Sequence, residues 1–260
     1  MKTTRRAVWA GVVACCALQA GSALASVDQL DMLKTAKHVE IFSQKIAKAY
    51  FYKQLDIRPD QAEADLKESL SKLKSSIATL QEGSDGNSKE ERNIGKFLAY
   101  THGELDSMLS KPYNKEAGAL MIDFSESLLE GANNLAGKYK GKGAEATMLT
   151  ETEQLLFLLE RVNKYYIAHK AGFKDYNNVV QLEKAVKDFE TGLAKINAYS
   201  YPENVQANVK NINQFWPVAK EFYLGVQENA LPVIVLASTD KLESEVKALE
   251  TFHTQEAVKK

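Results

Sequence analysis

The fold is decided by the stretch Leu66-Lys67-Glu68-Ser69-Leu70-Ser71-Lys72-Leu73-Lys74-Ser75-Ser76-Ile77-Ala78-Thr79-Leu80. Its large apolar residues recur at alternating spacings of four and three positions, and they are Leu66, Leu70, Leu73, Ile77 and Leu80. Because an α-helix has about 3.6 residues per turn, this spacing places all of them on one face. An apolar face of this kind has to be buried, so the stretch predicts one helix of a larger helical assembly.

Similar apolar faces extend along most of the chain, and glycine and proline are concentrated between them. With 14 glycines and 5 prolines in 260 residues, the sequence favours long helices over many short strands. Ser88 with Glu91, and Thr150 with Glu153, have the S-x-x-E form of a capping box that begins a helix. We therefore predict an all-α fold with about eight helices, at residues 28–56, 60–82, 89–110, 115–139, 147–171, 175–198, 203–226 and 230–256.

The second half of the chain repeats the pattern of the first half. Leu66 corresponds to Leu182 and Ile77 to Leu193, each pair being separated by 116 positions. Unrelated helical patterns would drift out of phase, so a constant offset indicates an internal repeat. We predict two tandem four-helix-bundle units, at residues 26–140 and 144–260.

The N-terminus has the features of a secretory signal peptide. Three basic residues precede an apolar stretch at residues 7–20, and Ala23 and Ala25 provide the small residues of a cleavage site. We predict that residues 1–25 are removed and that the mature chain is periplasmic.

Two other export signals are weaker alternatives. Thr4-Arg5-Arg6 resembles the start of a twin-arginine signal, but the usual downstream features of that signal are missing. Cys15 could be the lipidated cysteine of a lipoprotein, but it would leave a very short apolar region before it. Lipoprotein anchoring is therefore not expected.

Composition excludes several classes of partner and chemistry for the mature chain. Three of the 33 basic residues lie in the signal peptide, which leaves 30 basic against 34 acidic residues and a net charge near −4. A negative surface argues against binding to nucleic acid or to anionic membranes. Both cysteines, Cys15 and Cys16, also lie in the signal peptide, which excludes disulfides and thiol chemistry. No later apolar stretch is long enough to predict a membrane span.

Residues 36–50 resemble a known family. They read Ala36-Lys37-His38-Val39-Glu40-Ile41-Phe42-Ser43-Gln44-Lys45-Ile46-Ala47-Lys48-Ala49-Tyr50. This is similar to the first helix of the PilJ-type domain, the N-terminal ligand-sensing module of type IV pilus methyl-accepting chemotaxis transducers, which usually reads A-G-x-Q-R-M-L-S-Q-R-x-A-K-x-Y. Residues 159–166 resemble a degenerate second copy. The resemblance implies a sensory helical scaffold in each half.

Related modules of nitrate and nitrite sensor kinases are also similar, and there an arginine binds the anion across two equivalent helices. A guanidinium suits that role because it presents fixed, charged donors to a planar oxyanion. In this chain the corresponding positions are Glu40 and Leu156, which cannot act as anion donors. The resemblance therefore implies a binding scaffold but does not imply nitrate as the ligand.

Polar residues on the two equivalent helices are the strongest candidates for a binding site. A pseudo-dimer of the two units could place these helices face to face, and the candidates are His38, Gln44, Lys45, Gln154 and Arg161. The mixture of imidazole, amide and cationic groups suits a small polar or zwitterionic ligand. The alternative is that these side chains are solvated or only join neighbouring helices.

Metal and catalytic chemistry have little support in the sequence. A di-metal helical bundle needs two Glu-x-x-His pairs, and only Glu250-Thr251-Phe252-His253 has that form. No phosphate-binding loop or nucleophile motif is present. We predict no metal, no cofactor and no enzymatic activity.

The sequence thus predicts an exported ligand-binding or sensory accessory protein that lacks its own signalling domain. Such a protein would pass information to a separate envelope or membrane-receptor protein. The alternative is a structural or adaptor protein of the cell envelope or the pilus machinery, without a small-molecule ligand.

Overall fold

The computed structural model confirms the all-α prediction. It describes the backbone of residues 14–84, 88–139, 143–228 and 231–258, and within these ranges there are eight α-helices, one short 3₁₀ helix and no strand. The helices are α1 (Ala14–Gln54), α2 (Pro59–Ser84), α3 (Lys89–Leu109), α4 (Lys115–Ala136), α5 (Ala144–Lys170), α6 (Tyr176–Ala198), α7 (Glu203–Leu224) and α8 (Pro232–Val258), with η1 (Gly225–Gln227) after α7.

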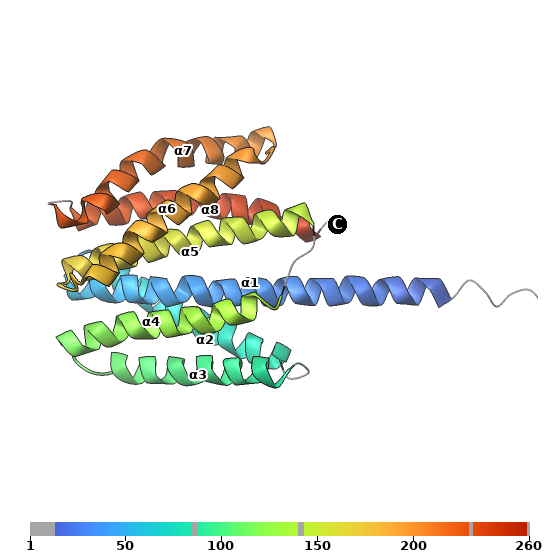
Figure 1. The fold of residues 1–260 in the computed structure, drawn as a ribbon, viewed down its shortest axis with the longest axis horizontal. Helices are drawn as coiled ribbons and strands as arrows, with labels where there is room; N and C mark the ends of the chain where they lie inside the picture. The colour runs from blue at the N-terminus through green and yellow to red at the C-terminus, as the bar shows by residue number, and fades with distance from the viewer. Residues whose placement is uncertain (1–13, 85–87, 140–142, 229–230, 259–260) are drawn as a thin grey trace, which may run out of the picture.

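The predicted signal peptide overlaps the beginning of α1. Residues 1–13 lie outside the described residues, and residues 14–25 belong to the N-terminal part of α1, which extends beyond the other helices (Figure 1). Removal of residues 1–25 stays a prediction. Among the helices that the structure describes, none combines the length and the apolar character that crossing a membrane requires.

The helices pack in the same pattern in both halves of the chain. In the first half α1 packs against α2 and α4, and α3 packs against these same two helices. In the second half α5 packs against α6 and α8, and α7 likewise contacts both. The packing therefore pairs α1 with α5, α2 with α6, α3 with α7 and α4 with α8. Figure 1 shows the two groups of helices on either side of the adjacent helices α1 and α5.

The two central helices run in the same direction and nearly in register. Lys37 of α1 contacts Gln154 of α5. About two helical turns further along both helices, Gln44 contacts Arg161. Each of these pairs is separated by 117 positions, close to the repeat offset of 116. Equivalent faces of α1 and α5 therefore meet along the contact between the two halves.

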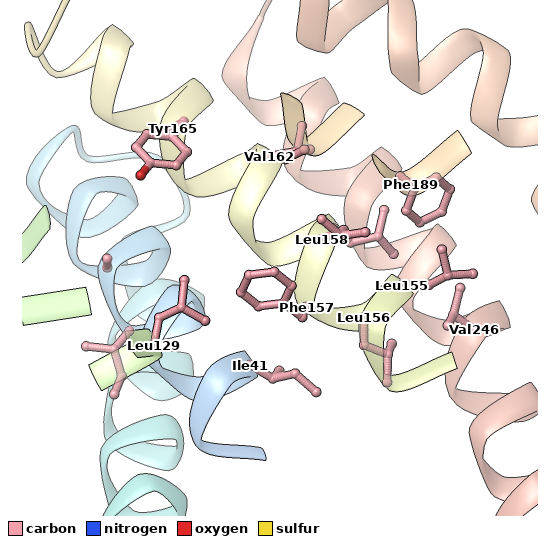
Figure 2. Packing of buried hydrophobic residues seen from close by; sticks show 14 of the residues in the cluster. Ile41, Leu129, Leu155, Leu156, Phe157, Leu158, Val162, Tyr165, Phe189 and Val246 are labelled. Carbon is pink, nitrogen blue, oxygen red and sulfur yellow. The ribbon is translucent and has the colours of Figure 1, made fainter. Parts of the chain in front are cut away.

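Helix α5 is buried on all sides because helices of both halves surround it. Every residue from Leu155 to His169 is buried. Leu155 and Leu158 point towards Phe189 of α6, whereas Phe157 lies on the side of α1 and α4 (Figure 2). The apolar side chains of α5 pack into both halves, and buried polar side chains such as Arg161 and Lys164 pair with residues of α4, so α5 forms the centre of the core.

The start of α5 differs from the sequence prediction. The pattern Thr150-x-x-Glu153 predicted a cap, but α5 begins at Ala144, after Gly143 with φ of 98°. Thr150 lies inside the helix and its hydroxyl donates to the carbonyl of Ala146 at 2.9 Å. The residues before Thr150 are good helix formers with apolar side chains to bury, which extends the helix past the local cap signal. The cap at Ser88 is confirmed, because its Oγ accepts from the backbone N–H of Glu91 at 3.3 Å.

A second cap allows a simple test of local stability. The side chain of Asn114 accepts a hydrogen bond from the backbone N–H of Ala117 at 2.7 Å, at the start of α4. Asn114→Ala is expected to lower the free energy of unfolding by about 1 kcal/mol, because the start of α4 loses its capping hydrogen bond. Urea denaturation measures this change. Asn134→Ala, at an exposed interior position of the same helix, should cause no loss. An equal loss in both variants would contradict the capping role.

Candidate functional site

A groove of about 580 Å³ lies between α1, α2, α5 and α8, and we call it the central groove. It contains both cationic and anionic side chains above an apolar wall. The main lining residues are His38, Ile41, Phe42 and Lys45 of α1, Glu68, Ser69, Lys72 and Ser76 of α2, Glu153 and Leu156 of α5, and Glu243, Lys247 and Glu250 of α8. This mixture of charge and apolar surface can hold a small polar molecule.

The five candidate residues from the sequence do not form a single site. His38 and Lys45 line the central groove. Gln44 and Arg161 lie on the opposite side of the α1–α5 contact, where they contact α4 and α6. Gln154 accepts a long hydrogen bond of 3.4 Å from Lys37. The separation follows from helix geometry, because consecutive residues such as Gln44 and Lys45 point in directions about 100° apart.

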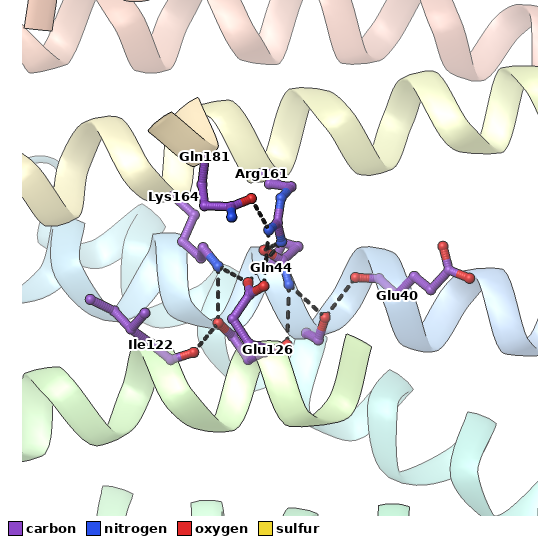
Figure 3. Close-up of polar contacts among 9 residues, drawn as sticks. Glu40, Gln44, Ile122, Glu126, Arg161, Lys164 and Gln181 are labelled. Atoms are coloured by element: carbon purple, nitrogen blue, oxygen red, sulfur yellow. Dashed lines mark hydrogen bonds and ion pairs between the residues drawn. The ribbon is translucent and has the colours of Figure 1, made fainter. Parts of the chain in front are cut away.

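Arg161 belongs to a closed network, which we call the Arg161 cluster and which comprises Gln44, Ser125, Glu126, Arg161, Lys164 and Gln181 (Figure 3). The guanidinium donates to the two carboxylate oxygens of Glu126 at 2.7 and 2.9 Å. It also donates to Gln181 at 3.0 Å and to Gln44 at 3.3 Å. Glu126 thus takes the position that an anionic ligand of Arg161 would need.

Lys164 is the most buried cation of the Arg161 cluster. Its ammonium group donates to Ser125 at 3.1 Å and to Glu126. Burial acts to raise the pKa of Glu126, but the charges of Lys164 and Arg161 outweigh it and hold that pKa at about 2. The carboxylate therefore stays ionised at neutral pH and pairs with Arg161 and Lys164. Burial lowers the pKa of Lys164 itself to about 7, although the charge of Glu126 opposes this shift.

The position at which the resemblance would place an anion-binding arginine is also closed. Glu40 is buried and forms an ion pair of 2.8 Å with Lys37. Burial raises the pKa of the Glu40 carboxyl group, although Lys37 opposes this shift. The equivalent residue in the second half, Leu156, is part of the apolar wall of the central groove.

Glu153 is the most unusual side chain of the central groove. Only 1% of its surface is exposed, and neither carboxylate oxygen has a hydrogen-bond partner. Burial and the nearby charge of Glu250 raise its pKa to about 8. An unpaired buried carboxyl group is costly, so this group is poised to receive a cation or a hydrogen-bond donor.

His38 and Glu250 converge with Glu153 at one end of the central groove. One potential ligand atom of each residue lies within 4.8 Å of those of the other two. Burial and then the charge of Lys34 lower the pKa of His38, so its imidazole is neutral at pH 7. Glu250 is in turn 3.7 Å from Lys34. We call these three residues, His38, Glu153 and Glu250, the acidic end of the groove.

Lysines dominate the other end of the central groove. Lys45 and Lys247 both pair with Glu243, and Lys72 pairs with Glu68, so three cations share two carboxylates. Burial acts to raise the pKa of Glu243, but nearby lysines outweigh it and hold that pKa at about 2. The groove therefore has carboxyl groups and an imidazole at one end and lysine–carboxylate pairs at the other.

Sequence reasoning missed Glu153 because its pattern was interpreted as a helix cap. The Glu-x-x-His form of Glu250 and His253 gave no sign that Glu250 lies beside His38 instead. His253 is fully buried and contacts Glu145 at 3.1 Å and Tyr201 at 2.9 Å, away from Glu250. One signal was available, since Glu153 is an acidic residue between Leu149 and Leu156, which lie on the same helical face.

No protein-family model, curated protein or solved structure matches this chain.

Proposed function

We propose that this protein is an exported accessory protein that binds a small polar or zwitterionic ligand in the central groove. It would report the bound state to a separate envelope or membrane-receptor protein, as the PilJ-type resemblance implies. The observation that carries the proposal is the unpartnered carboxyl group of Glu153, because a buried polar group without a partner costs stability unless something binds it.

The charge distribution supports a ligand with separated charges. A positive group of the ligand would lie against Glu153 and Glu250, and a negative group would lie against the lysine end. His38 and Lys45, which are at the two ends, are seven residues apart on α1. At a rise of 1.5 Å per residue this separation is about 10 Å, which suits an extended zwitterion better than a single small anion.

A thermal-shift screen tests this proposal. The purified chain would be heated with amino acids, short peptides, small organic acids and amines, nitrate and nitrite. A true ligand at 100 times its dissociation constant should stabilise the folded state by about 2.7 kcal/mol and raise the melting temperature. Glu153→Gln and Lys45→Met should each reduce the shift, because each removes one of the groups that the ligand would contact.

Lys96→Ala provides the matched control. Lys96 is an exposed lysine on α3, outside the central groove, so its loss should leave the shift unchanged. The proposal fails if no compound raises the melting temperature, or if the shift persists unchanged in both groove variants.

The adaptor alternative also has a specific observation in its favour. Large apolar side chains are exposed on α7 and at the start of α8, and they include Phe215, Val218, Val233 and Ile234. Exposed apolar patches of this kind are typical of protein-binding surfaces. If Val218→Asp abolishes the protein's activity in cells while Glu153→Gln does not, the adaptor function is favoured over ligand binding.

A further inference from the structure

We propose that the acidic end of the central groove binds a divalent transition-metal ion through His38, Glu153 and Glu250. The inference rests on the proposed binding function of the groove and identifies the positive centre that Glu153 receives. It stands on three residues from three helices, α1, α5 and α8, whose ligand atoms converge within 4.8 Å.

The unpartnered state of Glu153 is the second, independent observation. Its carboxyl group is almost completely buried, lines the groove and has no hydrogen-bond partner on either oxygen. A group that served only to stabilise the fold would be paired, as Glu126 is with Arg161 and Lys164. A bound cation would provide the missing partner.

The ligand types favour a transition metal over other cations. Calcium and magnesium prefer sites made only of oxygen ligands, whereas a neutral imidazole suits zinc, cobalt, nickel, copper and iron. The imidazole of His38 lines the groove, and one of its ring nitrogens lies beside the carboxylate oxygens of Glu153 and Glu250. Two carboxylates balance the charge of a divalent ion, and three protein ligands leave at least one coordination position free.

The three ligand atoms have to move only slightly closer together to coordinate one metal ion. Metal–ligand bonds of about 2.1 Å bring tetrahedral ligand atoms to about 3.4 Å from one another. The ligand atoms now lie within 4.8 Å of one another, so side-chain rotations that move them by about an ångström would suffice. His38 and Glu250 are half-buried and can rotate, whereas Glu153 is held in the core. Lys34, whose ion pair with Glu250 is long at 3.7 Å, can move into solvent when the metal binds.

Titration of the untagged, metal-free chain with zinc and cobalt tests the inference. We expect one Zn²⁺ per chain by calorimetry, and visible d–d absorption of Co²⁺ with the intensity of a four- or five-coordinate site. His38→Ala, Glu153→Gln and Glu250→Gln should each weaken Zn²⁺ binding at least about 100-fold, which is the upper end of the loss caused by changing an outer-shell partner.

Two control variants separate this site from surface binding. Glu68→Gln changes a groove carboxylate outside the acidic end, and His102→Ala removes a histidine that lies 3.4 Å from Asp106 elsewhere on the molecule. Both should bind Zn²⁺ like the wild type. The inference is wrong if the wild type binds no metal, or if binding survives Glu153→Gln and is lost in His102→Ala.

The ligand screen, run in the presence of a chelator, distinguishes failure of the metal site from failure of the proposed function. If zwitterions or amines still raise the melting temperature of the metal-free wild type but not of Glu153→Gln, an organic cation fills the groove. That result overturns the metal site and retains the binding function. If neither metals nor organic compounds bind, both proposals are wrong.

Discussion

Replacing Glu126 with alanine is expected to lower the free energy of unfolding by about 3 kcal/mol at pH 7. The reason is that Lys164, with 0% of its side chain exposed, and Arg161 would lose their common carboxylate. Arg161 would then lack its buried counter-charge, and Lys164, whose pKa burial already lowers to about 7, would lose the anion that favours its charged form. These losses cost more than the loss of a surface pair. Glu126 itself is 34% exposed, so we expect the lower end of the usual range for such pairs.

The effect of Glu126→Ala should also depend on pH in a defined direction. The folded-state pKa of Glu126 is about 2, below its ordinary value of 4.5. Between these values the unfolded chain binds more protons, so the stability that Glu126 contributes is complete above about pH 4.5 and is lost as the pH falls towards 2. The stability difference between wild type and variant should therefore shrink on acidification.

Urea denaturation at several pH values measures both effects. Glu130→Ala, on the exposed side of the same helix, is the control and should change stability little at any pH. The double variant Glu126→Leu/Lys164→Met removes both charges and should recover part of the loss. A constant difference from pH 7 to pH 2 would contradict the assignment to the Glu126 carboxylate.

Phe189→Ala should destabilise the second half of the chain by about 3–5 kcal/mol. The ring is fully buried in α6 and stacks on Trp216 of α7, with ring centroids 4.0 Å apart. Truncation removes a large apolar surface from the core and leaves a cavity, and the closely packed interior can refill it only in part. It also ends the aromatic contact with Trp216, so the fluorescence of that indole should change in the folded state.

Phe215→Ala offers a matched comparison for Phe189→Ala. Phe215 is adjacent to Trp216 in sequence but is 40% exposed. The same substitution there should cost less than about 1 kcal/mol, because little buried surface is lost. Chemical denaturation followed by tryptophan fluorescence measures both variants. Equal losses would mean that burial does not decide the cost at these two positions.

Most of the fold could be predicted from local patterns. The leucine face at residues 66–80 predicted a helix at 60–82, and α2 spans Pro59–Ser84. Such faces are reliable because burial of one side of a helix imposes its 3.6-residue period on the sequence. The start of α5 was less predictable, since a cap signature at Thr150 competed with the helix-forming residues before it. The signal peptide, the domain boundaries and the PilJ-type resemblance stay predictions.

The candidate site could be predicted only in part, because side chains from separate helices form it. The sequence predicted that the equivalent helices carrying Gln44 and Arg161 could lie face to face, and these two residues do meet. It could not show that Glu126, from α4, fills the space beside Arg161. The sequence also could not predict that His38, Glu153 and Glu250 lie close together, since this depends on how three helices pack.

The equivalent packing of the two halves has a consequence for how a site can arise. The central groove, between α1, α2, α5 and α8, and the Arg161 cluster, between α5, α6, α1 and α4, occupy corresponding places. Lys45 in the groove corresponds to Arg161 in the cluster. In a homodimer any substitution appears in both places at once, so both would be open or both closed. In a single chain each half can change separately. Here Glu126 fills the Arg161 cluster, whereas the corresponding place in the other half, the central groove, is left accessible.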